Sequence, residues 1–402
     1  MQVSAPGRAD FLNTHQDYKG LPVVPVGLNL RTRIHGRAVS GTKVRVKSIN
    51  LEREGQTAFD EFDIREIGYK EKGWFGNYIR AIVNALKKFG YSNEIKGAEI
   101  AIDSDIPVGA GLGSSGALEV ATAKFFDAAF KLNLSKHDLA ELSYFAEREE
   151  LGIPCGRLDQ YGSSYGGIIK LETRPPFKVE KLVFRSFFLT VINSGIRHLT
   201  GEIHPKRQRE LDEGLSELLR LDLPKTIRAK LSAHLAEVLW ENLSENELEP
   251  YLKKINEKNA NRILYTLRSQ RSTEVALKIL RRQPVDIRKI SATVGEKLVT
   301  PAKYAPRNTR SCLLLGAVIN HQHELLRDLY ELSLPKIEEL REAAINAGAY
   351  GVKLSGAGMG GCLIAITKTE RGASEVLKAV IAAGAANGWI SKIDNGARID
   401  KV

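Results

Sequence analysis

The chain has 402 residues, of which 43% are hydrophobic, so it can bury a large core and is long enough for two domains. Its net charge of +11 comes from 59 Lys and Arg against 48 Asp and Glu, but both signs are interspersed and no basic arm is present. An anionic small-molecule substrate therefore explains the excess as well as nucleic acid does. No apolar run approaches the roughly 18 residues of a membrane span, and no charged segment followed by an apolar one opens the chain, which predicts a cytoplasmic protein without a membrane partner. Cys155, Cys312 and Cys362 are too few and too widely separated for a disulfide framework or a zinc knuckle.

The first part of the chain carries short runs of β-branched or alternating residues, which predict a small sheet. These runs are residues 23–26, 32–35 and 43–46. They follow a strand pattern at residues 3–11, interrupted by a Pro-Gly pair, and a polar loop at residues 13–20, which is a candidate site loop. An amphipathic helix is then expected over residues 74–89.

A glycine-rich stretch lies between a strand pattern at residues 98–102 and an apolar-periodic helix at residues 117–132. Its residues are Pro107, Val108, Gly109, Ala110, Gly111, Leu112, Gly113, Ser114, Ser115 and Gly116. Glycines at alternate positions let the backbone turn its N–H groups inward, and the dipole of the following helix adds partial positive charge. The stretch is therefore predicted to bind a phosphate.

The same glycines also satisfy the G-x-G-x-x-G pattern of dinucleotide-binding folds. In that fold the glycines leave their strand directly, whereas residues 103–107 intervene here. A Walker A loop is excluded because no lysine follows the glycines. The remaining interpretation is a lysine-free phosphate loop, in which the hydroxyls of Ser114 and Ser115 could lie beside a magnesium ion and a polyphosphate. A glycine-rich connector without a ligand is the structural alternative.

Another helix is predicted over residues 136–151, and it carries three carboxylates near its end, where they oppose the helix dipole. These are Glu147, Glu149 and Glu150. They run into a turn at residues 152–156, which favours cation binding by at least one of them. A small-residue turn at 162–167 then leads to a strand at 168–171.

The second half begins with an apolar strand at residues 187–193 and changes character afterwards. From about 205 to 345 it is charged, leucine-patterned and helical, without tandem repeats. Residues 350–367 form a second glycine turn flanked by strands. A helix at 374–386 and a polar tail are expected to close the chain.

Three separated segments together resemble the GHMP kinases, the superfamily of galactokinase, homoserine, mevalonate and phosphomevalonate kinases. The segments are Ala5-Pro6-Gly7-Arg8 with His15-Gln16-Asp17-Tyr18, the loop from Pro107 to Gly116, and Leu354 to Gly361. Within this superfamily the chain most resembles the galactokinases. The resemblance implies an α+β fold of two lobes, with a lobe similar to the second domain of ribosomal protein S5 at residues 1–185 and a ferredoxin-like lobe with added helices at residues 186–402.

The resemblance further implies an ATP-dependent sugar kinase that uses Mg²⁺ and transfers the γ-phosphoryl group to a sugar hydroxyl, expected to be the anomeric one. Ser115 and Glu147 match the family's magnesium ligands, Asp159 matches its catalytic aspartate, and Arg8 matches the arginine paired with that aspartate. The sugar-binding positions are matched by His15, Asp17 and Gly156. The adenine positions are matched by Trp74 and Tyr78, and the third motif supplies Gly356, Gly358 and Gly360, which are expected to let one strand approach the phosphate loop closely.

These roles agree with the chemistry of phosphoryl transfer. A carboxylate such as Asp159 can accept the proton of the attacking hydroxyl, and a guanidinium such as Arg8 favours its charged form and stabilises charge on the transferring group. Each residue also has a structural interpretation: Asp159 could cap a turn, Arg8 could be a solvated charge, and His15, Trp74 and Tyr78 could be packing residues.

The chain departs from the galactokinase pattern at two pocket positions. Thr14 stands where galactokinases usually have a glutamate that would contact the distal end of galactose, and the usual pocket tyrosine is replaced by Ile203 or His204, depending on a one-residue gap. Both a uronic acid such as galacturonate and a pentose such as arabinose are compatible with the loss of that glutamate. The acceptor, the oligomeric state and the nucleotide preference stay open.

Two other function classes compete with the kinase. One is a sensor that binds ATP and sugar but has lost turnover, and the other is a dinucleotide oxidoreductase based on the glycine pattern. The preserved serine pair, Glu147 and Asp159 favour the enzyme over the sensor.

Overall fold

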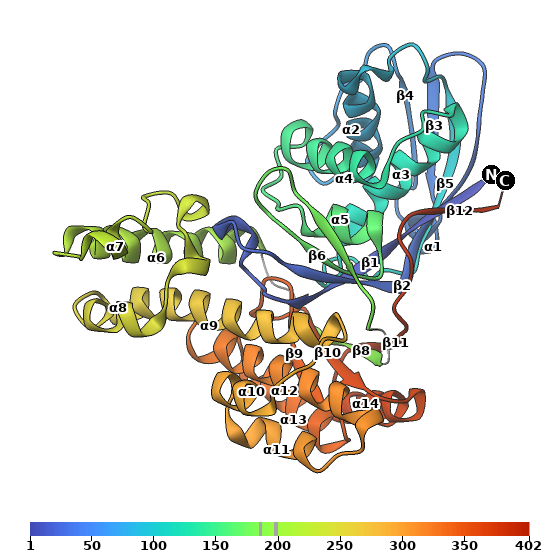
Figure 1. Ribbon diagram of the computed structural model, residues 1–402. Coiled ribbons are helices and arrows are strands. Elements are labelled where there is room, and N and C mark those ends of the chain that lie inside the picture. Colours follow the sequence, from blue (N-terminus) through green and yellow to red (C-terminus); the bar gives the residue numbers. More distant parts are fainter. Residues whose placement is uncertain (185–186, 197–199, 402) are drawn as a thin grey trace.

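The computed structural model describes residues 1–184, 187–196 and 200–401, which form two β-sheets with helices packed against each (Figure 1). The first sheet contains β1 (Gln2–Leu12), β2 (Val24–Ala38), β3 (Lys43–Ser48), β4 (Phe59–Asp63), β5 (Ala98–Ser104), β6 (Ile168–Leu171), β7 (Val179–Leu182) and β12 (Arg398–Lys401). Its order is β12-β1-β2-β5-β3-β4, and β6 pairs with both β2 and β7. All of these pairs are antiparallel except β3 with β5.

Helices cover one face of the first sheet. They are α2 (Gly76–Leu86), α3 (Ser114–Phe130), α4 (Lys136–Phe145) and α5 (Leu158–Tyr165), while the short α1 (Ile49–Arg53) follows β3. The sequence of strand β3 explains which face of the sheet the helices cover. Val44 and Val46 point to that face and are buried, while the alternate lysines and arginine are exposed on the other face. The buried valines join Ile79, Ile82 and Phe125 in one apolar core.

The second sheet has the order β11-β8-β10-β9, and all of its pairs are antiparallel. Its strands are β8 (Phe188–Asn193), β9 (Gly351–Ser355), β10 (Cys362–Thr367) and β11 (Asn387–Ser391). The helices nearest to it are α12 (Arg307–Asp328), α13 (Pro335–Asn346) and α14 (Glu370–Ala382). The central strand β10 is buried along its whole length, which its run of apolar residues predicts.

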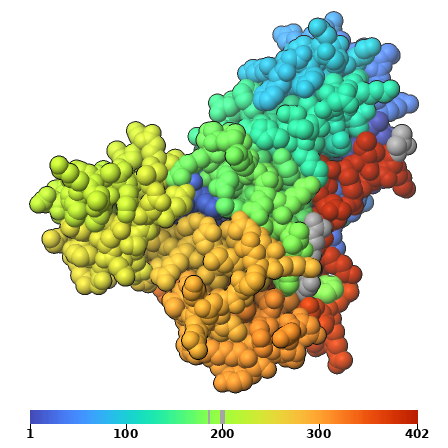
Figure 2. Space-filling model, viewed as in Figure 1, coloured from blue at the N-terminus to red at the C-terminus, as the bar shows by residue number. Residues whose placement is uncertain are grey.

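The remaining helices form a region between β8 and α12. They are α6 (Thr200–Arg220), α7 (Lys225–Arg228), α8 (Glu245–Leu252), α9 (Glu257–Leu280), α10 (Ile287–Val294) and α11 (Glu296–Lys303). Helices α6 to α8 and the start of α9 have a core of their own around the buried Trp240. Figure 2 shows this part projecting from the rest of the molecule, with a hollow where it meets the two lobes. Among the described residues, no helix combines the length and apolar character that crossing a membrane requires.

The predicted helical character of residues 205–345 is therefore confirmed, whereas several local predictions are wrong. Strand β1 is continuous through the Pro-Gly pair because a register shift between Pro6 and Arg8 absorbs the break. Residues 162–167 do not form a simple turn, because α5 extends to Tyr165. Helix α3 begins at Ser114, three residues earlier than predicted.

The prediction that the chain ends in a polar tail without regular structure is also wrong, because this segment contains the strands β11 and β12. The last of them, β12, pairs with β1 in the first sheet, so the two chain ends lie side by side (Figure 1). Residues 398–401, placed by the sequence in the second lobe, thus belong to the first sheet. The boundary itself, at residues 185–186, falls outside the described residues and stays a prediction.

The contact between α12 and β9 depends on two glycines. A Cβ atom on Gly316 would lie 2.3 Å from the Tyr350 carbonyl oxygen, and one on Gly351 would lie 2.4 Å from the Gly316 carbonyl oxygen. We expect Gly316→Ala to lower the free energy of unfolding by about 1–3 kcal/mol through overpacking, despite alanine's better helix propensity. Thermal unfolding of the variant measures this. The matched control is Gly68→Ala, where a Cβ would meet nothing within 4 Å, and equal melting temperatures for the two variants would contradict the packing argument.

Candidate active site

The phosphate loop adopts a conformation that only glycine tolerates easily at three alternate positions. Gly109, Gly111 and Gly113 have φ angles of 72°, 75° and 68°, all in the left-handed region. Gly113 is the residue before α3, whose first helical residue is Ser114. The loop thus delivers its backbone directly to a helix N-terminus, which suits an anion.

Arg8 and Asp159 lie beside this loop. The Nε and Nη2 atoms of Arg8 donate to Oδ1 of Asp159 at 2.8 and 2.5 Å, and Nη1 donates to the Gly111 carbonyl at 2.6 Å. The Arg8 side chain is 8% exposed and that of Asp159 is 26% exposed, so the carboxylate is the more accessible partner. A Cβ atom on Gly113 would lie 3.4 Å from Oδ2 of Asp159, and one on Gly116 would lie 2.9 Å from its Cβ. The two predicted catalytic residues are therefore packed against the start of α3.

The predicted magnesium ligands are also close together. Glu147 lies in a π-helical turn (Ala146–Glu150) that continues α4, and it accepts a hydrogen bond of 2.6 Å from Nε2 of Gln160. The side chains of Ser115 and Cys155 lie close enough to lower its pKa. Burial and the charge of Asp159 raise the pKa of Glu147 to about 7. The described residues contain no group of three or more His, Cys, Asp or Glu side chains arranged to hold a metal. One hydroxyl and one carboxylate fit Mg²⁺ when phosphate oxygens and water complete its shell.

The sequence interpretation missed Glu119, a second carboxyl group at this place. It lies one helical turn after Ser115 on α3, is fully buried, and accepts a hydrogen bond of 3.2 Å from Nε2 of Gln160, which also donates to Glu147 at 2.6 Å. Burial and the nearby charge of Glu147 raise the pKa of Glu119 well above its usual range. A glutamate in an otherwise apolar helix pattern, four residues after a candidate ligand, is the signal that could have found it.

The predicted sugar residues Asp17 and Gly156 are in contact. Asp17 begins a short 3₁₀ helix (Asp17–Lys19), and a Cβ atom on Gly156 would lie only 2.1 Å from Oδ2 of Asp17. Glycine at position 156 is thus a steric requirement for this position of the carboxylate. Burial raises the pKa of Asp17, and the negative charge of Asp159 adds to this effect.

His15 and His204 form a stacked pair with ring centroids 4.4 Å apart. Nε2 of His15 donates to the carbonyl of Ala357, in the third motif, at 3.0 Å, and Nδ1 has no hydrogen-bond partner among the described residues. Burial lowers the pKa of both rings, and the two rings' proximity adds to the effect for His15. The pair therefore stays neutral near pH 7.

Thr14 is buried, and its hydroxyl oxygen accepts a hydrogen bond of 2.7 Å from Nζ of Lys353 on β9. Trp74 does not lie on the helical face that the sequence predicts, because α2 begins only at Gly76. Its ring lies under the ammonium group of Lys70, 4.4 Å from the centroid. Tyr78 is on α2, and burial raises the pKa of its hydroxyl, with Glu147 and Glu119 contributing.

The third motif contacts the phosphate loop through glycine backbones, as the sequence predicts. A Cβ atom on Gly111 would lie 3.3 Å from the Ser355 carbonyl oxygen, and one on Gly356 would lie 3.5 Å from the Gly111 carbonyl oxygen. Cβ atoms on Gly358 and Gly360 would lie 2.7 and 2.6 Å from atoms of neighbouring segments. Gly111 and Gly356 therefore lie at the close approach between the two lobes, while Gly358 and Gly360 pack against Leu332 and Ile196 of the second lobe.

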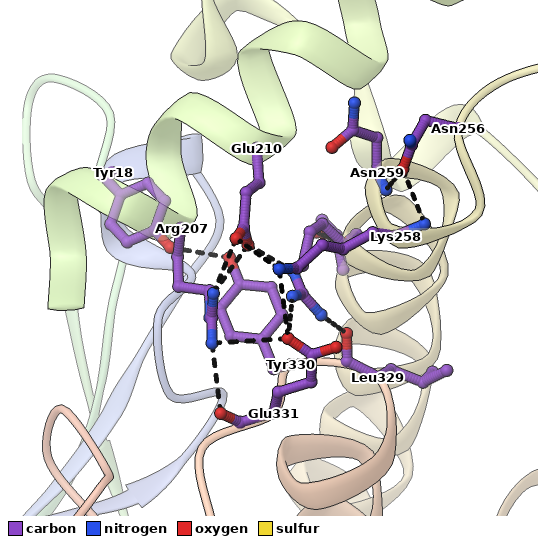
Figure 3. Close-up of polar contacts among 11 residues, drawn as sticks. Tyr18, Arg207, Glu210, Asn256, Lys258, Asn259, Leu329, Tyr330 and Glu331 are labelled. Atoms are coloured by element: carbon purple, nitrogen blue, oxygen red, sulfur yellow. Dashed lines mark hydrogen bonds and ion pairs between the residues drawn. The ribbon is translucent and has the colours of Figure 1, made fainter.

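An ion-pair network joins α6, α9 and the segment after α12 (Figure 3). The hydroxyls of Tyr18 and Tyr330 are 2.7 Å apart, and the Tyr330 ring packs against His15 with centroids 5.4 Å apart. Glu210 on α6 pairs with Arg207 at 2.8 Å and with Arg262 on α9 at 2.7 Å. The network holds α6, which carries His204, against α9 and the segment after α12, and no sequence motif predicted it.

Comparisons with known proteins agree with this geometry. The sequence family described as GHMP kinases N terminal domain matches residues 77–167, and the GHMP kinases C terminal family matches residues 302–386. The galactokinase galactose-binding signature matches residues 1–38. A galactokinase of Roseiflexus sp. (strain RS-1) is 30% identical over 384 residues, which are 94% of this chain and 85% of that protein.

The chain belongs to the GHMP kinases, on their galactokinase branch. A galactokinase of Haemophilus influenzae is 27% identical and covers 92% of this GHMP kinase and 85% of its own length. The crystal structure of Lactococcus lactis galactokinase complexed with galactose has a TM-score of 0.76 at 26% identity, over 99% of this chain and 94% of that one. Methanococcus jannaschii mevalonate kinase, at 18% identity and a TM-score of 0.66 over 98% of each chain, shows the fold alone. The predicted two-lobed fold and the predicted enzyme class, a phosphotransferase with an alcohol group as acceptor, are thus confirmed for this GHMP kinase.

The neutral histidine pair gives a pH-dependent stability. His204 has a lowered pKa in the folded state, so the unfolded chain binds its proton more readily and stability is lost as the pH falls below the unfolded value of about 6.5. We expect His204→Phe, which keeps a ring over His15, to lose less stability than the wild type between pH 7.5 and 5.5. The difference in the melting-temperature change should be on the order of 2 °C. Replacing the exposed His234 by Phe is the control, and a His204→Phe profile identical to the control would refute the assignment.

Proposed function

We propose that this GHMP kinase transfers the γ-phosphoryl group of ATP to the anomeric hydroxyl of galactose or a closely related sugar. The observation that carries the proposal is the position of the Arg8–Asp159 pair against the loop at the start of α3, with Ser115 and Glu147 in contact beside it. The galactose bound to the Lactococcus relative and the galactose-binding signature at residues 1–38 support the sugar class.

Asp159 is the proposed base. Both hydrogen bonds from Arg8 go to Oδ1, so Oδ2 is free of Arg8 and is the oxygen that can accept the proton of the attacking hydroxyl. Arg8 cannot leave this position easily, because its third bond is to the Gly111 carbonyl. Its guanidinium therefore places fixed positive charge next to both the base and the phosphate loop, where charge on the transferring group is stabilised.

Ser115 and Glu147 are the residues that would hold Mg²⁺. Held there, the ion would supply positive charge that offsets the negative charge of the phosphates. Gln160 orients Glu147 through the bond of 2.6 Å, and Glu119 in turn accepts from the same amide nitrogen. Trp74 and Tyr78 are proposed to line the nucleotide side, and His15, Asp17, Gly156 and His204 the sugar side.

The chain's own residues leave one choice of substrate and one alternative function to be tested. Thr14 removes the usual carboxylate at the distal end, so galacturonate and arabinose are alternatives to galactose. A catalytically silent sensor for ATP and sugar is the second candidate function, and the intact contact between Arg8 and Asp159 argues against it.

The test replaces the base without changing its shape. We expect Asp159→Asn to lower kcat by about 10²- to 10⁴-fold, because it removes the proton acceptor while the loop and the magnesium ligands stay in place. ADP release, measured with MgATP and a panel of galactose, arabinose and galacturonate, gives the rate, and the MgATP-induced thermal shift measures binding. The control is Asp328→Asn, an exposed aspartate paired with Arg327, which should behave as wild type.

The same assay separates the alternatives. Wild-type turnover by Asp159→Asn would remove the proposed base. A wild-type protein that binds ATP and a sugar but releases no ADP with any acceptor would be the sensor. A thermal shift larger with NAD than with MgATP would favour the oxidoreductase.

A further inference from the structure

Asp10 is a buried carboxylate on the same face of β1 as the catalytic arginine. The pairing of β1 with β2 is regular from Arg8 to Asp10, and residues two apart on a regular strand project to the same side. Arg8 reaches Asp159 from that side. The Asp10 side chain is therefore directed toward the sugar side of the site, and only 5% of the residue is exposed.

One oxygen of this carboxylate has no partner. Oδ1 of Asp10 is buried and accepts no hydrogen bond among the described residues. A buried carboxylate oxygen without a donor is costly, and such groups in native structures mark places where a ligand or water supplies the missing bond.

A buried lysine lies beside Asp10 but does not supply the missing donor for Oδ1. Nζ of Lys353 donates to the main-chain carbonyl of Asp10 at 2.9 Å and to Oγ1 of Thr14 at 2.7 Å. Burial raises the pKa of Asp10, and the charge of Lys353 opposes this rise more than that of Arg8 does. Oδ1 nevertheless has no hydrogen-bond partner among the described residues, so the lysine compensates the charge without satisfying this oxygen.

The surroundings of Asp10 belong to the sugar side. Besides Lys353, the charged groups Arg8 and Asp17 act on its carboxylate, and Asp10 in turn acts on His204. The carboxylate that galactokinases usually carry at position 14 is absent, while a carboxylate at position 10 lies next to Thr14.

We propose that Asp10 is a specificity-determining residue whose Oδ1 accepts a hydrogen bond from a hydroxyl of the acceptor sugar, so that the enzyme selects a neutral sugar over a uronic acid. The inference rests on the proposed function and narrows its substrate class. A hydroxyl supplies the donor that Oδ1 lacks. A uronate carboxylate would instead face Asp10 and Asp17, and like charges at short range in a buried site exclude the wrong substrate.

The wild-type protein gives the first test. On a panel of galactose, arabinose and galacturonate with MgATP, a neutral sugar should have a kcat/KM at least 100-fold above that of galacturonate. Preference for galacturonate would overturn the proposal while leaving the kinase function intact. Absence of turnover with every sugar would remove the kinase function instead, and calorimetric binding of the same sugars would then decide the role of Asp10.

Asp10→Asn gives the second test, because it removes the charge and keeps the shape. We expect KM for the preferred neutral sugar to rise 10-fold or more, KM for ATP to change less than 2-fold, and the kcat/KM ratio of galacturonate to the neutral sugar to rise at least 10-fold. A purely structural role of Asp10 would lower thermal stability and reduce kcat/KM for every sugar by the same factor. An unchanged kcat/KM ratio of galacturonate to the neutral sugar would therefore overturn the proposal.

Asp328→Asn is the matched control. It makes the same chemical change at an exposed aspartate paired with Arg327, so it should keep the discrimination against galacturonate within about 3-fold of wild type. A loss of discrimination as large as in Asp10→Asn would show that the effect does not belong to position 10 and would overturn the proposal.

Discussion

The site depends on one guanidinium group that joins three parts of the chain. The side chain of Arg8 projects from β1. Two of its nitrogen atoms donate to the Asp159 carboxylate on α5, and the third donates to the Gly111 carbonyl in the glycine loop. Arginine can do this because its donors lie in a fixed planar arrangement, and a lysine in its place would have to choose among these acceptors. The proposed base, the predicted phosphate loop and a strand, which lie far apart in the sequence, are thereby held in one geometry.

Glycines set the distances around that guanidinium. Gly116 leaves no room for a Cβ between α3 and the Asp159 side chain, where a Cβ would lie 2.9 Å from that of Asp159, and Gly162 does the same where α5 passes over Arg8, with a would-be Cβ 3.0 Å from that of Arg8. Gly111 and Gly356 bring the loop and the third motif together, and both have positive φ angles. At these two positions and at Gly109 and Gly113 the glycine provides backbone freedom. At Gly116 and Gly162 the requirement is close packing, which explains why glycines occur inside helices that they would otherwise weaken.

Local patterns in the sequence were sufficient to predict a glycine turn at a helix N-terminus, since glycine spacing before a helix has a physical meaning that needs no tertiary structure. Phosphate binding by that turn stays a prediction. The family resemblance supplied the partners Arg8 and Asp159, which lie 151 positions apart and show no local signal. Glu119, Asp10 and the ion pairs of Glu210 could not be predicted, because a single charged residue in an apolar pattern does not reveal which distant group it will contact. The error at the C-terminal tail has the same cause: β12 is a short, exposed strand whose sheet partner, β1, is at the other end of the chain.

The buried carboxyl groups of the site indicate which chemical groups a ligand would have to supply. Burial raises the pKa of Asp10, Asp17, Glu119 and Glu147, so each of them is held in an environment that disfavours its negative charge. The Asp159 carboxylate is paired with the Arg8 guanidinium. In the proposed function, a divalent cation beside Glu147 and hydroxyl donors beside Asp10 and Asp17 would supply the positive charge and the hydrogen bonds that the protein does not. Because these groups would be satisfied by different reactants, the sugar and the metal–nucleotide complex would each leave part of the set unsatisfied when bound alone, which would favour the ternary complex.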